Sequence, residues 1–242
     1  MSRTIVLTGA VVLLAACGAS PPRMPTAAGA AAPRMPPAGV LAYRLDPEHC
    51  EVRVLVYRAG ALARLGHNHV IVNHALGGWA LPRSEAHPAA FYLEMPVDGF
   101  VVDDPAARAA EGADFSATVP DEARSGTREH LLGAAQLDAA RFPEITVSSL
   151  AIAPAAAGTG LADPGAGAVQ LLATVEISVA GHTSRLDVPF VLDSSPGRVA
   201  GAGSVVVRQS ALGLTPYAAI LGALEVQDEI TIRFSFAALA PS

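Results

Sequence analysis

Apolar and polar residues alternate with a period of two along several separate stretches of the chain. In an extended strand this alternation puts successive side chains on opposite faces, so each stretch predicts a half-buried strand. The clearest stretches are Glu51–Tyr57, Ala90–Val97, Leu186–Leu192 and Ile230–Phe236, and further strands are expected at Val169–Val179 and Gly203–Arg208. The apolar faces of the clearest stretches consist of Val52, Val54 and Val56; Phe91, Leu93, Met95 and Val97; Leu186, Val188, Phe190 and Leu192; and Ile230, Ile232, Phe234 and Phe236.

The connections between these strands have signatures of their own. Ala180–Thr183 separates two alternating runs and contains a glycine, which predicts a hairpin turn. Residues 154–168 are rich in Ala, Gly and Pro and predict a long loop. A helical excursion is expected in the middle of the chain, with a short helix over Ala106–Glu111 and a second helix over residues 120–132. Gly133 would end the second helix.

Two adjacent acids, Asp103 and Asp104, precede Pro105 at the start of the first of these helices. An acid followed by proline is typical of a helix cap and first helical position, so we expect a cap here rather than an acid–base pair.

The pattern as a whole predicts an all-β protein, mostly antiparallel, with a small helical insertion. One apolar face on every strand suits either a closed barrel or a sandwich, and periodicity does not choose between them.

The N-terminus has the features of an export signal, which we assign to residues 1–16. Arg3 supplies a positive charge, and the apolar run Ile5–Ala16 is too short to span a bilayer core of about 30 Å. The ending Leu14-Ala15-Ala16-Cys17 resembles a bacterial lipobox, which implies that Cys17 becomes the lipidated first residue of the mature protein. An ordinary signal peptide that happens to contain a cysteine is the alternative. Gly18 after Cys17 resembles lipoproteins sorted to the outer membrane, so we expect a periplasmic, membrane-anchored protein.

Composition divides the remaining chain into a linker and one domain. Residues 17–39 are rich in Ala, Pro and Gly and predict a lipidated flexible linker, whereas residues 40–239 form a single β domain. The net charge of −6, with no basic run, argues against nucleic acid as a partner. With Cys17 lipidated, Cys50 has no partner for an intramolecular disulfide, and its parity with Val52 predicts burial on the apolar face.

Sequence motifs for catalysis are missing. The chain has no nucleophile elbow, no His-Glu-x-x-His, no phosphate-binding Gly-Lys-Ser/Thr and no dinucleotide fingerprint. We therefore expect a protein that is not an enzyme and that carries no cofactor apart from a bound lipid. Arg124, Arg128 and Arg141 would suit phosphate or carboxylate recognition, but solvated or acid-paired positions are the simpler expectation.

A histidine cluster surrounds Asn68. His67 and His69 lie two apart on an expected strand, which places them on one face about 7 Å apart along the backbone. Three roles stay open: structural hydrogen bonding, contact with the polar head of a ligand, or metal binding. A stable zinc site needs further ligands, and no spacing assigns them to His49, His130 or Glu129, while His74 is expected on the opposite face.

Four segments, in chain order, resemble parts of the YceI-like family: Tyr43–Val52, Leu132–Ile145, Gly181–Phe190 and Gln227–Ile232. The resemblance covers residues 41–238. It implies an eight-stranded, lipocalin-like antiparallel barrel whose hydrophobic interior holds a long lipid such as a polyisoprenoid. Barrels of eight strands are about the size that holds one small ligand. Cys50 stands where the family more often has His or Ser, and the histidine cluster inherits no role.

We therefore expect a periplasmic binding or carrier protein for a long lipophilic ligand, which would be a polyisoprenoid, an isoprenoid quinone or a fatty derivative. Two alternatives stay open: a metal-binding protein or metal-dependent enzyme built on His67 and His69, and a structural envelope lipoprotein with a filled core. The expected partners are the lipid and, through the anchor, the membrane. The candidate ligand-binding residues are Val54, Val56, His67, His69, Phe91, Leu93, Met95, Leu186, Val188, Phe190, Ile232 and Phe234.

Overall fold

A computed structural model describes residues 32–156 and 167–241 of the chain. The strands are β1 (Tyr43–Leu45), β2 (Glu51–Ala59), β3 (His69–Asn73), β4 (Gly77–Leu81), β5 (Ala90–Pro96), β6 (Val101–Val102), β7 (Glu144–Pro154), β8 (Ala168–Val179), β9 (His182–Ser195), β10 (Arg198–Arg208), β11 (Ala218–Ala219) and β12 (Leu224–Leu239). The helices are α1 (Pro105–Ala109) and α2 (Asp121–Leu132), with short 3₁₀ turns η1 (Pro47–His49), η2 (Ala63–Leu65), η3 (Val97–Gly99), η4 (Ala113–Phe115), η5 (Ser210–Leu212) and η6 (Ile220–Gly222).

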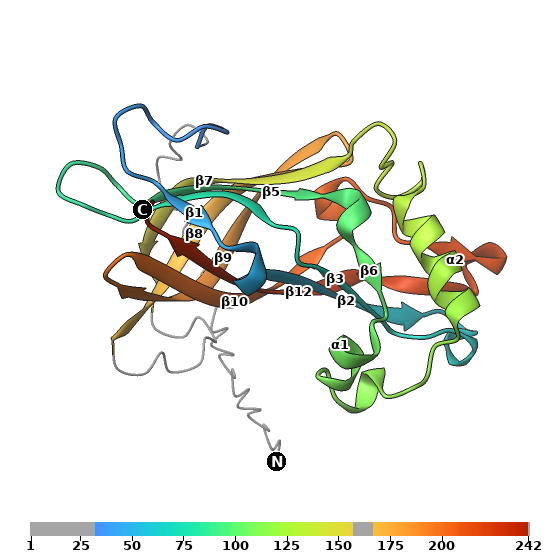
Figure 1. Cartoon of the computed structure of the whole chain (residues 1–242). Coiled ribbons are helices and arrows are strands. Elements are labelled where there is room, and N and C mark those ends of the chain that lie inside the picture. Colours follow the sequence, from blue (N-terminus) through green and yellow to red (C-terminus); the bar gives the residue numbers. More distant parts are fainter. Residues whose placement is uncertain (1–31, 157–166, 242) are drawn as a thin grey trace, which may run out of the picture.

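The strands form a closed antiparallel barrel (Figure 1). Eight strands form the barrel in the order β1-β4-β5-β7-β8-β9-β10-β12, and the pairing of β12 with β1 closes it. The earlier part of β12 pairs along the same edge with β2, and β2 pairs in turn with β3. β1 and β2 are therefore two pieces of one wall segment, interrupted by η1. The closing ladder confirms the predicted eight-stranded barrel and decides between barrel and sandwich, which periodicity left open.

The predicted strands are confirmed and extend beyond the alternating stretches, and the first predicted helix is α1, which ends at Ala109 rather than at Glu111. Most of the loop predicted over residues 154–168 lies outside the described residues. Ala180 and Gly181 form the turn between β8 and β9, and the second predicted helix is α2. The carboxylate of Asp104 accepts a hydrogen bond from the Ala107 N–H at 2.9 Å, so Asp104 is the expected cap of α1. Val97 differs from expectation, because it belongs to η3 rather than to the preceding strand.

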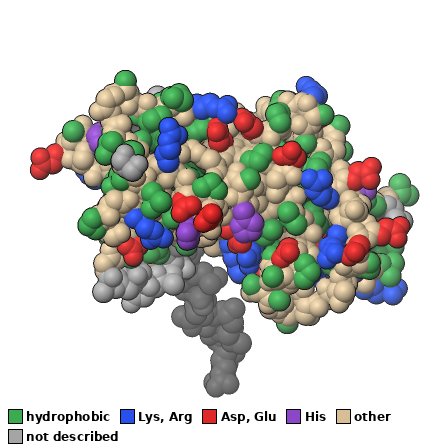
Figure 2. Space-filling view, in the orientation of Figure 1, with side chains coloured by type: hydrophobic (Ala, Val, Ile, Leu, Met, Phe, Trp, Pro, Cys, Tyr) green, Lys and Arg blue, Asp and Glu red, His purple; other side chains and the backbone are tan. Residues whose placement is uncertain are grey.

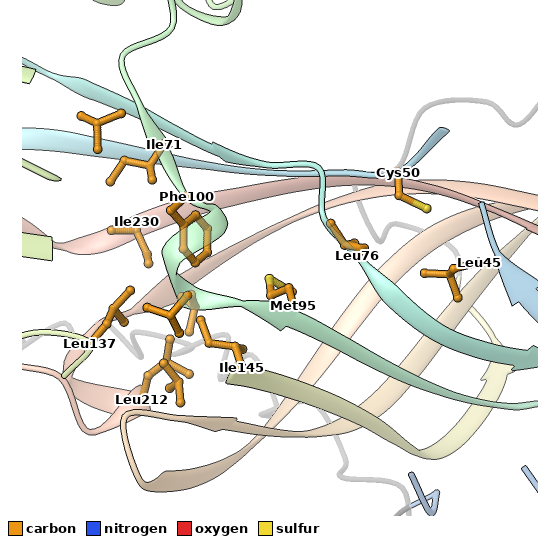
Figure 3. Close-up of a cluster of buried hydrophobic side chains, with 14 of the residues drawn as sticks. Leu45, Cys50, Ile71, Leu76, Met95, Phe100, Leu137, Ile145, Leu212 and Ile230 are labelled. Carbon is orange, nitrogen blue, oxygen red and sulfur yellow. The ribbon is translucent and has the colours of Figure 1, made fainter. Parts of the chain in front are cut away.

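Cross-strand pairing directs the predicted apolar faces into the barrel. Val54 lies opposite Ile232 on one side and opposite Ile71 on the other. The largest buried cluster joins Ile71 to Phe100, Leu137, Leu212 and Ile230, and Figure 3 shows these side chains pointing into the space enclosed by the strands. Cys50, 2 % exposed, belongs to the same cluster, which confirms its expected burial.

The outer face of β3 is buried as well. Val70 and Val72 pack with Leu55 and with Phe115, from the segment that contains α1 and η4. This second cluster explains why the apolar residues of β3 follow no single parity in the sequence: one face lines the barrel and the other lies beneath α1.

Residues 32–42 lie against the outer face of β4 and β5. The Trp79 Nε1–H donates to the carbonyl of Arg34 at 3.1 Å, and Ala32, Val40 and Ala42 pack on the cluster that contains Trp79. The last part of the expected linker, residues 32–39, therefore lies against the domain, because the apolar outer face of β4 and β5 gives it a surface to cover. Cys17 and the export signal fall outside the described residues. Within the described ranges, no helix has both the length and the apolarity to cross a membrane.

Candidate ligand-binding lumen

The barrel lumen is lined by apolar side chains from β2, β5, β9 and β12. The structure brings together on this lining ten of the expected ligand-binding residues: Val54, Val56, Phe91, Leu93, Met95, Leu186, Val188, Phe190, Ile232 and Phe234. They converge because alternate residues of every strand in a closed barrel face the same interior.

Many of these lumen-facing side chains are half-buried rather than buried. Val54, Leu186 and Ile232 all retain accessible surface, although each lies within a paired strand. Because the barrel wall shields the opposite side of such a residue, the accessible surface faces the lumen. These residues therefore leave some apolar surface uncovered on the inner side of the wall. Met95 and Phe190 are exceptions at 5 % exposed each, and they belong to the packed part of the interior.

Phenylalanine rings occupy part of the lumen. Phe190 packs with Phe91, Phe234 and Phe236, and the ring centroids of Phe190 and Phe236 lie 6.3 Å apart. Gly203 on β10 makes room for one of these rings, since a Cβ there would lie 2.5 Å from the Cζ of Phe234. A flat aromatic and aliphatic lining of this kind suits a hydrocarbon ligand.

The histidine cluster does not have the expected geometry. β3 begins at His69, so His67 precedes the strand instead of sharing a strand face with His69. The two rings are nevertheless neighbours, with centroids 6.4 Å apart. His69 lies opposite Val56 in the ladder and therefore shares the lumen-facing side of β3 with Ile71. His74 follows the end of β3, and its Nδ1 lies 3.2 Å from the carbonyl oxygen of Cys50, so strand parity does not apply to it.

A buried ionic network holds His69 in place. The Asp103 carboxylate, 0 % exposed, lies 2.6 Å from His69 Nδ1 and 2.6 Å from Arg108 Nη1, and it accepts the Val70 N–H at 2.9 Å. Burial by itself would raise the pKa of Asp103. The hydrogen bond and charge of His69, the Val70 N–H and Arg108 outweigh burial and hold the pKa below its ordinary 3.8. Asp103 is thus ionised and His69 donates from Nδ1 to it.

Sequence reasoning missed this role of Asp103 and Arg108. Arg108 is 6 % exposed and also donates to the carbonyls of Asn68, at 2.7 Å, and Ala117, at 2.9 Å. The only local signal was a second acid beside the capping Asp104. Because Asp103 meets His69 across 34 positions of the chain, no spacing rule could have found the pair.

The other polar candidates have ordinary partners. Arg124 pairs with Asp121, and Arg141 pairs with Asp138 at 3.2 Å. Arg128 donates to the backbone carbonyls of Asp98 and Phe100 and so fastens α2 to η3 and to the residue that follows it. Across the described part of the chain, no three His, Cys, Asp or Glu side chains come together as a metal site requires. His49 and His74 instead border a groove of about 640 Å³ at the outer surface, beside β10 and β12.

Comparison with known protein families matches residues 43–238 to the YceI-like domain. The chain belongs to the YceI-like family. Two solved structures share the YceI-like fold at 15 % sequence identity. BcnA of Burkholderia cenocepacia has a TM-score of 0.55 over 80 % of this chain and 99 % of its own. A polyisoprenoid-binding domain from Saccharophagus degradans, implicated in plant cell wall breakdown, has a TM-score of 0.52 over 83 % of this chain and 99 % of its own. No curated protein sequence matches the chain.

Proposed function

We propose that this YceI-like protein binds and carries one long lipophilic molecule in the lumen of its barrel. The observation that carries the proposal is the row of half-buried apolar side chains, Val54, Leu186 and Ile232 among them, that face the interior of a closed eight-stranded wall. Barrels of this size hold either packed side chains or one ligand. Accessible apolar surface inside the wall favours the ligand.

The lining indicates the class of ligand. Aliphatic and phenylalanine side chains offer contacts to a hydrocarbon chain, and each buried methylene contributes about 0.8 kcal/mol before ordering costs. We propose a polyisoprenoid, an isoprenoid quinone or a fatty derivative. The polyisoprenoid-binding description of the Saccharophagus degradans domain supports the first of these.

The proposed activity is binding rather than catalysis. Among the polar residues described above, His69 most resembles a general base, because the Asp103 carboxylate orients its ring through a 2.6 Å contact with Nδ1. The described contacts of His69 include no nucleophile, and a base–acid pair without one does not make a hydrolytic site. We assign the pair a structural role at the start of β3.

We further propose that the protein is exported, lipidated at Cys17 and held at the periplasmic face of the outer membrane. This part rests on the sequence of residues 1–18, with the apolar run and Leu-Ala-Ala-Cys ending described above. A lipid anchor would keep a carrier of membrane-soluble molecules next to their source.

Lipid occupancy of purified variants tests the proposed function. The chain beginning at Gly18 is purified without detergent, weighed by native mass spectrometry and extracted with solvent to identify what it carries. Leu186→Gln and Val54→Gln place an amide in the half-buried part of the lumen, whereas Val206→Gln changes a 62 % exposed residue of β10 as the matched control. Met95 and Phe190 are poorer choices because polar groups at these buried positions would unfold the barrel.

We expect a co-purified lipid of defined mass in the parent and in Val206→Gln, and a strongly reduced load in both lumen variants at unchanged secondary structure. Equal loads in all variants would place the lipid outside the lumen. An empty parent protein that also refuses added polyprenols and quinones would contradict the proposal and favour a structural lipoprotein.

A further inference from the structure

Large apolar side chains are exposed on two adjoining loops beside α2. Leu221 in η6 is fully exposed, Leu65 in η2 is 59 % exposed and Tyr217 is 36 % exposed. We call these three residues the apolar tip. The backbone of Leu221 is in the left-handed region, with φ 54°, which costs conformational free energy for a leucine. In this conformation the leucine side chain is exposed. Exposed apolar groups gathered in this way commonly mark an interaction surface.

The two loops of the apolar tip are joined to each other and to α2. The Leu62 N–H donates to the carbonyl of Ala223 at 2.7 Å, and the Val226 N–H donates to the carbonyl of Tyr217 at 3.0 Å. The Tyr217 ring lies 5.0 Å from the ring of His130 on α2. The apolar tip is therefore one supported surface at the α2 end of the barrel, on the right in Figure 1.

The charges beside the apolar tip are of both signs: Glu225 of β12 lies beside η6, with its Oε2 4.0 Å from the position of a Cβ on Gly222, and two arginines border η2. Arg58 and Arg64 are exposed on the segment that leads into and through η2, and Arg58 is braced by its bond to the Gly66 carbonyl at 2.9 Å. Arginines at the rim of an apolar patch can reach phosphate groups while leucine and tyrosine enter the interface. Acidic and basic side chains are interspersed over the whole visible face, including the α2 end on the right (Figure 2).

Beyond the closed ring of eight strands, the wall that β2, β3 and β6 form at this end is incomplete. Within the described residues β6 pairs with β3 and forms no ladder with β7. Leu131 and Leu132 of α2 and Leu137 after it pack against the interior cluster there. Side-chain packing separates more readily than a ladder of backbone hydrogen bonds. A hydrocarbon chain would therefore enter the lumen more easily at the α2 end than through the hydrogen-bonded wall.

The predicted anchor can reach this arrangement. Ala32, where the described chain begins, follows Cys17 by 15 positions, and such a segment spans at most about 50 Å. The 16 residues of β12 give the barrel a length of about 50 Å as well. A protein anchored at Cys17 can therefore place the α2 end of its barrel on the bilayer that holds the anchor.

We propose that the apolar tip inserts into the interface of a lipid bilayer as a second membrane contact, and that the α2 end of the barrel thereby faces the membrane. The proposal extends the proposed carrier function and rests on it only for the nature of the cargo.

Site-specific labelling of the full chain tests the proposal. Cys50 is buried, so Leu221→Cys can be labelled selectively with an environment-sensitive fluorophore in the mature protein. The wild type, treated with the same dye, checks that Cys17 and Cys50 take up none. Ser204→Cys, exposed on the outer face of β10, is the matched control. Both proteins are added to phosphatidylcholine vesicles, with and without phosphatidylglycerol, that contain brominated acyl chains.

We expect a blue shift and strong quenching at position 221 and neither at position 204. Equal quenching at both positions, or quenching at neither, would overturn the proposal, and so would a concentration-dependent dimer that Leu221→Asp abolishes. Solvent extraction of the same protein preparations before vesicles are added reports lipid occupancy, so a failed carrier function and a failed membrane contact are told apart.

Discussion

Asp103 combines a buried carboxylate with a left-handed backbone conformation, φ 54. A non-glycine residue in this region costs on the order of 1 kcal/mol or more, and the cost is offset by the contacts that the conformation permits. The Asp103 N–H donates to the Val70 carbonyl at 2.7 Å, and its carboxylate accepts the Val70 N–H in return. These two bonds extend the pairing of β3 with β6 by one residue. The Asp103 carboxylate also binds His69 and Arg108.

Asp103→Asn removes the charge that compensates buried Arg108. Breaking a buried ion pair from one side costs about 3–5 kcal/mol, so we expect a loss of about that size in the free energy of unfolding by urea at pH 7. Asp104→Asn is the matched control, since asparagine caps a helix about as well as aspartate and should leave stability nearly unchanged. Equal losses in the two variants would contradict the assigned role of Asp103.

The same pair of variants has a defined pH dependence. Because the folded-state pKa of Asp103 is held below 3.8, its ionised form stabilises the fold fully above that pH. This stabilisation is lost as the pH falls through the lower folded-state pKa. We expect the wild type and Asp104→Asn to lose stability steeply below about pH 4, whereas Asp103→Asn lacks the contribution of that group.

The β8–β9 hairpin shows how one element depends on another. Ala180 and Gly181 both have positive φ, 48 and 77, as a two-residue turn between twisted strands requires. The turn also carries a packing constraint, because a Cβ on Gly181 would lie 2.5 Å from the Cζ of Phe142. Phe142 follows α2 in the chain, so the hairpin and the helical excursion hold each other at one end of the barrel.

Gly181→Ala and Gly197→Ala separate these two demands. Both glycines have φ 77, but a Cβ on Gly197, in the β9–β10 turn, would meet nothing within 4 Å. We expect Gly197→Ala to cost about 1 kcal/mol for the backbone alone, and Gly181→Ala to cost about 1–3 kcal/mol more from overpacking. Thermal and urea unfolding measure both, and equal costs would show that Phe142 moves aside freely.

At the scale of the whole molecule, the barrel contains a packed region and an accessible one. Ala173, Val175 and Phe190 are nearly inaccessible, whereas Leu186, Leu192 and Phe236 contact both interior clusters and remain half-buried. A ligand that fills the accessible region replaces apolar surface facing water by apolar contacts, so it should stabilise the folded state.

A bound lipid should raise the melting temperature of the delipidated protein. At a free concentration about 100 times the dissociation constant, the gain is about 2.7 kcal/mol. For a domain of this size that gain corresponds to about 5–10 °C. Scanning calorimetry of the delipidated chain with and without a polyprenol measures the shift, and Leu186→Gln should reduce it. An unchanged melting temperature would speak against a ligand in the lumen.

Local patterns sufficed for much of this protein. The strands, the Ala180–Gly181 turn, the cap at Asp104 and the two helices follow from period-two alternation and from the preferences of single residues. The same alternation selected the lumen-facing side chains of β2, β5, β9 and β12, because in a strand the parity of a residue determines its face.

Only the tertiary structure decided what depends on distant partners. Closure of the barrel requires β1 to meet β12 across almost the whole described chain, as in the pairing of Arg44 with Leu239. The roles of His69 and Asp103 required β3 and β6 to lie side by side, and the place of residues 32–42 required the apolar outer face of β4 and β5. Sequence patterns report the two faces of one element, whereas folding decides what covers each face.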